Sequence, residues 1–165
     1  MLAAAGELGQ VDLVAIDAAG LFERAATEPA PERGQQGAHA RAALDACLQS
    51  SWEATHALVR VAYLERGHPG RVVYVAPADA GAHDELARCA RAARAALENL
   101  ARTLSIEWAR YDVTTVTIAP GAHSGVGEIA ALVAYLASPA GAYFSGCLLD
   151  LTGPVPASRA SERAR

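Results

Sequence analysis

The chain has 165 residues, enough for one domain built around one hydrophobic core. More than half of the residues are hydrophobic, few are aromatic, and the formal net charge is −4. That charge argues against a nucleic acid or an anionic membrane as the partner. No stretch reaches the roughly 18 consecutive apolar residues that a membrane helix needs.

The first third of the chain predicts one strand, one loop and one helix. Residues 3–9 have the composition of a last helical turn, and residues 11–16 form a short apolar strand that turns out at Asp17. Residues 23–40 are rich in Pro, Gly, Gln and charge, which predicts an exposed loop. Residues 41–65 have helical periodicity and end at a Gly- and Pro-containing turn.

The remaining chain continues to alternate between strand and helix. Its most regular stretch is a long helix with one apolar stripe, followed at once by a β-branched strand that ends at Pro120-Gly121. The predicted elements are strand 71–75, helix 84–110, strand 113–118, helix 128–137 and strand 147–151. Four strands separated by helices predict an α/β domain over residues 1–153, with a parallel sheet and right-handed crossovers. The Pro/Ser/Arg-rich residues 154–165 predict a disordered tail.

Several stretches resemble a known family. The stretch RAALENLARTLSIEWARYDVTTVTIAPG, residues 94–121, resembles the catalytic helix and following strand of short-chain dehydrogenases/reductases. VDLVAIDAAG (residues 11–20), RVVYV (71–75) and EIAALVAYLA (128–137) are similar to other segments of the family's second half. The resemblance implies a truncated Rossmann-like sheet of about four strands. The dinucleotide-binding N-terminal half of the family would then be absent.

The resemblance also places the family's four catalytic residues. In the family, a tyrosine donates the proton, a lysine lowers the pKa of that tyrosine and holds the ribose, and a serine orients the carbonyl group. The family's Asn, Ser, Tyr and Lys positions are occupied here by Ser51, Pro77, Ala90 and Arg94. Alanine has no proton to donate, and an arginine does not lose its proton. The family's substrate lid is also reduced to a very short link before residue 128.

The interface elements of the family are kept. The resemblance implies pairing through the two long helices and through the last helix and strand. The expected interface residues are Leu44, Leu48, Leu58, Ala93, Leu97, Leu100, Leu104, Trp108, Leu132, Tyr135 and Leu149. The strand at 11–16 would also have an open edge that the 23–40 loop or another subunit covers.

The main hypothesis is therefore a catalytically inactive, SDR-like pseudoenzyme. It would stabilise an active paralogue in a cytoplasmic hetero-dimer or hetero-tetramer. No cofactor is expected in this chain, and NAD(P) is expected in the partner. The alternative is a nicotinamide-independent enzyme or a ligand-binding protein on a remodelled scaffold, with Asp17, His83 and Cys89 as the candidate residues. A turn-forming Asp17 and an inert Cys89 are the simpler interpretations.

The sequence offers no pattern for a metal, a disulfide framework or a leader. The five histidines and three cysteines have no ligand spacing, so we expect no metal site. The widely spaced cysteines favour free thiols in a reducing cytoplasm. The first apolar run contains Glu7 and has no basic start, which does not match a signal peptide. We expect Asp84 to cap the long helix that follows it.

Overall fold

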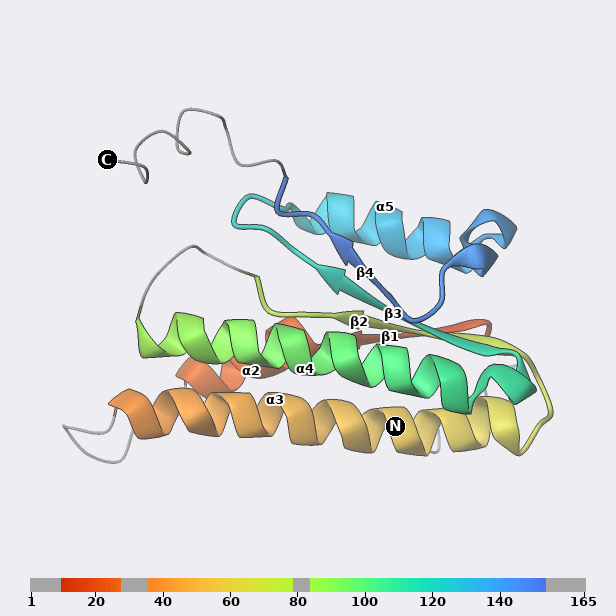
Figure 1. The fold of residues 1–165 in the computed structure, drawn as a ribbon, viewed down its shortest axis with the longest axis horizontal. Helices are drawn as coiled ribbons and strands as arrows, with labels where there is room; N and C mark the ends of the chain where they lie inside the picture. Colours follow the sequence, from red (N-terminus) through yellow and green to blue (C-terminus); the bar gives the residue numbers. More distant parts are fainter. Residues whose placement is uncertain (1–9, 28–35, 79–83, 154–165) are drawn as a thin grey trace.

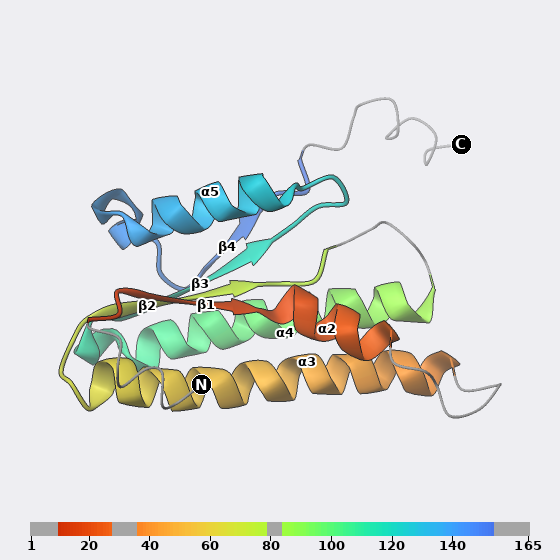
Figure 2. The ribbon, with the colours of Figure 1, turned by 180° about the vertical axis from the view of Figure 1, so that it is seen from behind.

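A parallel β-sheet lies between two helical layers. The computed structural model describes residues 10–27, 36–78 and 84–153. The strands β1 (Leu13–Asp17), β2 (Gly70–Val75), β3 (Val113–Ala119) and β4 (Cys147–Asp150) pair in that order, and each pair is parallel. Helices α2 (Ala18–Thr27), α3 (Gln36–Val59) and α4 (Glu85–Glu107) cover one face, and α5 (Val126–Ala137) lies on the other (Figures 1 and 2). This arrangement confirms the predicted Rossmann-like α/β class.

The alternation of side chains along the strands divides the core into two. In β2, Val72 and Tyr74 belong to the cluster that faces α2, α3 and α4, whereas Val73 belongs to the cluster that includes Leu136 of α5. Because successive strand residues point to opposite faces, apolar side chains are needed at every central position of β2. All three of these β2 side chains are fully buried.

Helix α4 is joined to β3 by hydrogen bonds as well as by packing. The Thr117 hydroxyl donates to the Leu97 carbonyl at 3.1 Å, and Thr115 donates to the Ala101 carbonyl one turn further along α4. Both threonines are fully buried, so these bonds satisfy hydroxyls that would otherwise be costly to bury. The Asp84 carboxylate accepts from the Ala87 N–H at 2.7 Å, which confirms the predicted cap of α4.

The core face of α3 consists of small and β-branched side chains, with the leucines at its sides. The fully or nearly fully buried α3 residues are small or β-branched, namely Ala40, Ala43, Cys47, Ser51, Thr55 and Val59. Leu44, Leu48 and Leu58 are half-buried at the sides of this face. A π-helical turn, Arg60–Leu64, ends the helix. There the ring of Tyr63 lies so close to Gly70 that a side chain at position 70 would overlap it.

The predicted loop at residues 23–40 is wrong at both of its ends. Residues 18–27 form α2, and α3 already begins at Gln36. Helix α2 is amphipathic and buries Ala18 and Phe22 against the sheet and α3. Burial of this apolar face favours a helix here, although the surrounding polar residues predicted a loop. Residues 28–35 lie outside the described part, as do the expected helical turn at 3–9 and the expected tail at 154–165.

The outer edge of β1 has no neighbouring strand within the described residues. Strand β1 is the first strand of the sheet order, and among the described strands it pairs with β2 alone. Helix α2, formed from part of the expected covering loop, packs beside α3 below the sheet instead of along this edge (Figure 2). Ala15, in the middle of β1, is exposed. The open-edge expectation therefore holds for the described part of the chain.

Two buried tyrosines are structural. The Tyr63 hydroxyl donates to the Arg71 carbonyl at 3.0 Å, and the Tyr74 hydroxyl lies 2.9 Å from the Thr55 hydroxyl. Burial raises the pKa of Tyr63 and of Tyr74 from 10.0 to about 12. Both phenols are therefore neutral near pH 7, and neither has the lowered pKa that a proton-donating tyrosine requires at that pH.

We predict a loss of stability between about pH 10 and pH 12. In this range the folded chain keeps two protons that the unfolded chain has lost, so the free energy of unfolding falls as the pH rises. The expected contribution is on the order of 2 kcal/mol for each phenol. Urea unfolding at stepped alkaline pH, together with tyrosinate absorbance, would measure it.

The matched variants are Tyr74→Phe and Tyr143→Phe, because Tyr143 is 93% exposed. The decrease of the free energy of unfolding between pH 10 and pH 12 should become smaller in Tyr74→Phe and stay the same in Tyr143→Phe. An unchanged slope in Tyr74→Phe would show that burial of this phenol does not control the pKa.

Candidate functional site

The positions that the resemblance assigns to the family's catalytic residues are mostly closed to solvent. Ser51, in the middle of α3, is fully buried, and its hydroxyl has no hydrogen-bond partner among the described residues. Pro77 is buried just after β2, and Ala90 in α4 is 8% exposed. None of these three residues presents a proton donor to a substrate.

Arg94 is the one charged residue of the four positions, and it is bound within the chain. Its guanidinium Nη2 lies 2.8 Å from Asp150 Oδ2, and Nη1 donates to the Pro120 carbonyl at 3.5 Å. The Arg94 side chain is only 14% exposed. These contacts join α4 to the carboxyl ends of β3 and β4, the edge where ligands bind in open α/β sheets.

Asp150 completes this ion pair from the end of β4. Its Oδ1 accepts from the Thr152 N–H at 2.9 Å. That hydrogen bond and the Arg94 guanidinium hold the pKa of Asp150 below its ordinary value, so the carboxylate is charged at neutral pH. Sequence reasoning missed Asp150, because only the parallel pairing of β3 with β4 brings it to α4.

The described residues at this edge do not fit the nicotinamide ribose as the family holds it. All 14 basic residues of the sequence are arginines, so no lysine is present. The arginine at the lysine position already contacts Asp150 and the Pro120 carbonyl.

Asp17 has a structural contact, as the simpler interpretation required. Its Oδ1 accepts from the Gly20 N–H at 2.9 Å, at the first turn of α2. A Cβ at position 20 would lie 2.3 Å from Asp17 Oδ2, so Gly20 permits this close approach. His83 lies outside the described residues, and Asp17 and Cys89 are not shown to share a site with it.

The cysteines are free thiols with raised pKa values. Burial raises the pKa of Cys47 to about 11, and burial also raises the pKa of Cys89 and Cys147. A raised pKa leaves little thiolate at neutral pH, so these thiols are poor nucleophiles. Among the described residues, no group of histidine, cysteine or acidic side chains is arranged to hold a metal ion.

The expected interface residues divide into two groups. Ala93, Leu97 and Leu104 are at most 3% exposed and form part of this chain's own core. An arginine at Leu97 would therefore disrupt the fold before it tested any pairing. The others are half-buried or exposed, and they are Leu44, Leu48, Leu58, Leu100, Trp108, Leu132, Tyr135 and Leu149.

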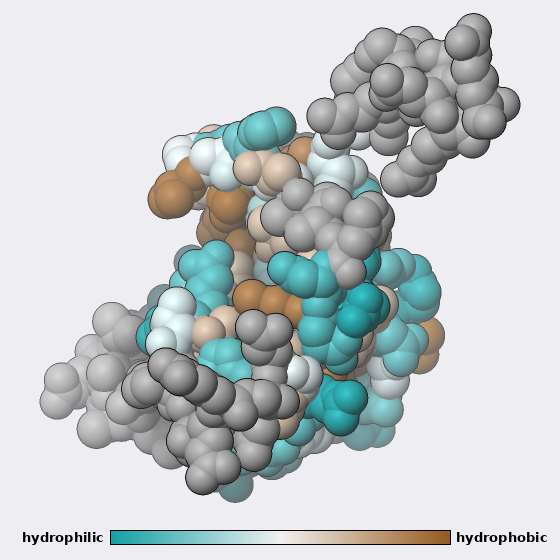
Figure 3. Space-filling view, turned by 90° about the vertical axis from the view of Figure 1, so that its left-hand side faces the viewer, coloured by the Kyte–Doolittle hydropathy of each residue, from teal (hydrophilic) through white to brown (hydrophobic). Residues whose placement is uncertain are grey.

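Further apolar side chains are exposed beside this second group. Trp52 of α3 is 44% exposed, and Ile106 of α4 is 75% exposed. On the other face of the sheet, α5 carries one charged residue, Glu128, and exposes Val126 and Tyr135. Figure 3 shows hydrophobic residues gathered in the upper layer of the molecule, at the level of α5.

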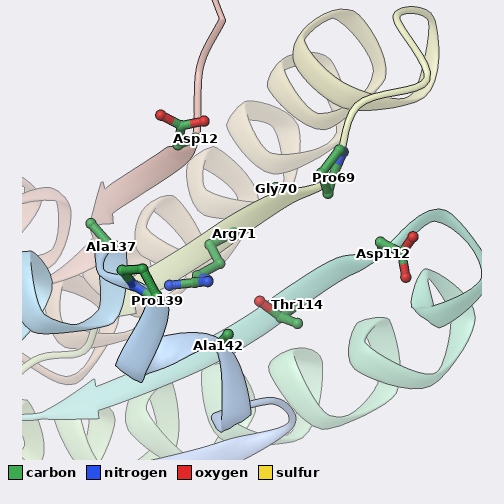
Figure 4. A pocket seen from close by; sticks show the side chains of 9 residues that line it. All are labelled: Asp12, Pro69, Gly70, Arg71, Asp112, Thr114, Ala137, Pro139 and Ala142. Atoms are coloured by element: carbon green, nitrogen blue, oxygen red, sulfur yellow. The ribbon is translucent and has the colours of Figure 1, made fainter.

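A pocket lies at the opposite edge of the sheet, at the amino ends of β1, β2 and β3. Its volume is about 450 Å³. It is lined by Asp12, Pro69, Gly70, Arg71, Asp112, Thr114, Ala137, Pro139 and Ala142 (Figure 4). No residue expected from the sequence to be functional lines it. The sequence does place Arg71 and Thr114 at the beginnings of two neighbouring predicted strands, and this shared position is the feature that could have indicated the pocket.

We predict that Arg94 and Asp150 are energetically coupled. In a double-mutant cycle with Arg94→Gln and Asp150→Asn, the expected coupling energy is roughly 1 kcal/mol, reduced by the partial exposure of Asp150. Denaturant unfolding at neutral pH measures it. Because the pKa of Asp150 is lowered by folding, the coupling should disappear as the pH falls through that pKa.

The control cycle uses Glu98→Gln and Arg102→Gln, an exposed pair one turn apart on α4. Its expected coupling is roughly 0.3–0.5 kcal/mol. A coupling between Arg94 and Asp150 no larger than this control would mean that the ion pair does not hold the carboxyl edge together.

Comparison with known proteins finds similarity in structure and none in sequence. No protein-family model matches the chain, and no curated protein matches it.

Within the described residues, no helix is both long enough and apolar enough to cross a membrane.

Many solved structures share its fold. An acetoin dehydrogenase from Enterobacter cloacae is 20% identical with a TM-score of 0.69, and the match covers 88% of this chain and 64% of that one. A short-chain dehydrogenase/reductase family oxidoreductase from Burkholderia thailandensis is 21% identical with a TM-score of 0.68, over 99% and 72% of the two chains. A 3-ketoacyl-(acyl-carrier-protein) reductase from Brucella melitensis in complex with NADH is 17% identical with a TM-score of 0.64, and the match covers 92% of this chain and 70% of that one.

The acetoin dehydrogenases are matched over only 64% of their own length. At these identities the likeness concerns the fold and leaves activity open. The chain therefore has the fold of the short-chain dehydrogenases/reductases, over about two thirds of the length of such proteins.

Proposed function

We propose that this chain is a non-catalytic, SDR-like subunit that stabilises a complete, NAD(P)-dependent paralogue in a hetero-dimer or hetero-tetramer. The observation that carries the proposal is the contact of Arg94 with Asp150 and with the Pro120 carbonyl. Arg94 stands where the resemblance expects a ribose-binding lysine, and its guanidinium instead contacts the ends of two strands, β3 and β4. NAD(P) and turnover then belong to the partner.

The other resembling positions support the same proposal. A ketoreductase of this fold needs a side chain that gives a proton to the carbonyl oxygen. Ala90 has no such proton, Pro77 has no hydroxyl, and the Ser51 hydroxyl is buried inside the chain. Burial raises the pKa of Tyr63 and of Tyr74, which moves both values further from neutral pH.

Two surfaces are the proposed contacts with the paralogue. The first is the outer face of α3 and α4, with Trp52 and Ile106 exposed and Leu100 and Trp108 half-buried. The second is α5 with β4, where Tyr135 is exposed and Leu132 and Leu149 are half-buried. Burial of such large apolar side chains on association releases water and favours binding. The free thiols Cys47, Cys89 and Cys147 accord with a reducing cytoplasm.

The test is native mass spectrometry of this chain, alone and co-expressed with a full-length family member from the same genome. NAD(P)H-dependent activity is measured on each sample. We expect a mixed oligomer, no activity from this chain alone, and higher stability of the partner within the complex. A folded chain that ignores every such paralogue, or that oxidises NAD(P)H by itself, would contradict the proposal.

Two surface variants locate the contact. Ile106→Arg and Tyr135→Arg introduce a charge at exposed positions, so each should leave the fold unchanged and weaken pairing at one surface. We expect at least one of them to weaken the mixed complex about tenfold or more. Arg24→Glu, at an exposed position of α2, is the control and should pair normally. Normal pairing by both surface variants would show that neither face is the interface.

A further inference from the structure

The pocket at the amino ends of the strands has the features of a binding site, and its residues are separate from those on which the proposed function rests. The starts of β1, β2 and β3 form its floor. The end of α5 and the turn Pro139–Tyr143 form one wall (Figure 4). Its volume of about 450 Å³ lies within the range usual for small-molecule sites. It lies at the end of the sheet opposite to Arg94 and Asp150.

Arg71 places a positive charge in this pocket. Its side chain is half-buried, and Nη1 donates to the Ser138 carbonyl at 2.9 Å. Within the described residues it forms no ion pair with a carboxylate. A guanidinium has five N–H donors, so most of them remain available to a ligand. A partly buried cation without a counter-ion is costly unless an anion joins it.

Thr114 provides a second polar group next to this charge. Arg71 and Thr114 are register partners in the parallel pairing of β2 with β3, so their side chains share one face of the sheet. The Thr114 hydroxyl is buried and has no hydrogen-bond partner among the described residues. Buried hydroxyls are normally paired, and a ligand acceptor at this wall would pair this one.

The rest of the lining limits the kind of ligand. Pro69, Ala137, Pro139 and Ala142 offer small apolar surfaces around the two polar groups. Asp12 and Asp112 lie at opposite ends of the pocket (Figure 4). Their negative charges repel every anion, and they repel a ligand with several negative charges, such as a nucleotide or an inorganic phosphate, more strongly than a single carboxylate.

We propose that this pocket binds a small organic monocarboxylate with a short apolar body. The carboxylate accepts hydrogen bonds from the Arg71 guanidinium, which matches a carboxylate in geometry as well as in charge. The Thr114 hydroxyl donates to the same carboxylate, and the apolar body packs against the proline and alanine side chains.

Isothermal titration calorimetry with isobutyrate tests the proposal, with amide chemical shifts of β2 and β3 followed by NMR. Isobutyrate should bind at one site and shift the amide signals near Arg71. The neutral isostere isobutyramide and inorganic phosphate should bind at least about tenfold more weakly. Arg71→Gln should weaken isobutyrate binding by about the same factor, and Thr114→Val by a smaller factor.

Arg24→Gln is the matched control, since it removes an exposed arginine outside the pocket. It should bind isobutyrate as the unchanged protein does. Thermal unfolding of each variant checks that the fold is retained. Equal binding by Arg71→Gln and the unchanged protein, equal affinity for isobutyrate and isobutyramide, or no saturable binding of isobutyrate would each overturn the proposal.

Discussion

The packing of α4 onto β3 is the contact on which the rest of the structure depends. It buries Ala93, Leu97, Ala101 and Leu104 and joins helix to strand through the hydroxyls of Thr115 and Thr117. Because these hydroxyls bond to α4 carbonyls, the rotation of the helix on the sheet is specified as well as its distance. That rotation directs Arg94 to the ends of β3 and β4.

The carboxyl and amino ends of the parallel strands carry different chemical groups. At the carboxyl edge, Arg94 and Asp150 neutralise each other and join three elements of the chain. At the amino edge, Arg71 has no carboxylate partner within the described residues and opens into a pocket. In open α/β sheets the carboxyl edge usually receives the ligand. In this chain, the Thr114 hydroxyl, unpaired among the described residues, and the Arg71 guanidinium, which hydrogen-bonds only a carbonyl there, lie at the other end.

The fold leaves apolar surface that one chain does not cover. Parallel sheets are normally buried on both faces, and their edges are normally paired or protected. Here the outer edge of β1 has no neighbouring strand in the described part, and α5 exposes Val126 and Tyr135. Ile106 is exposed on the opposite layer. An association partner would bury these groups, which is the physical basis for the proposed subunit role.

The sequence alone determined the strand and helix types from residue 41 onward, the parallel class of the sheet and the Asp84 cap. These features depend on local periodicity and capping chemistry, which are readable within a few residues. It did not determine α2, since burial of Phe22 against distant elements outweighed the local loop signals. Only the tertiary structure decided that Leu97 belongs to the core, that Arg94 meets Asp150 and that Arg71 lies beside Thr114. Each of these depends on residues far apart in the sequence, whose distances are set by strand order and helix rotation.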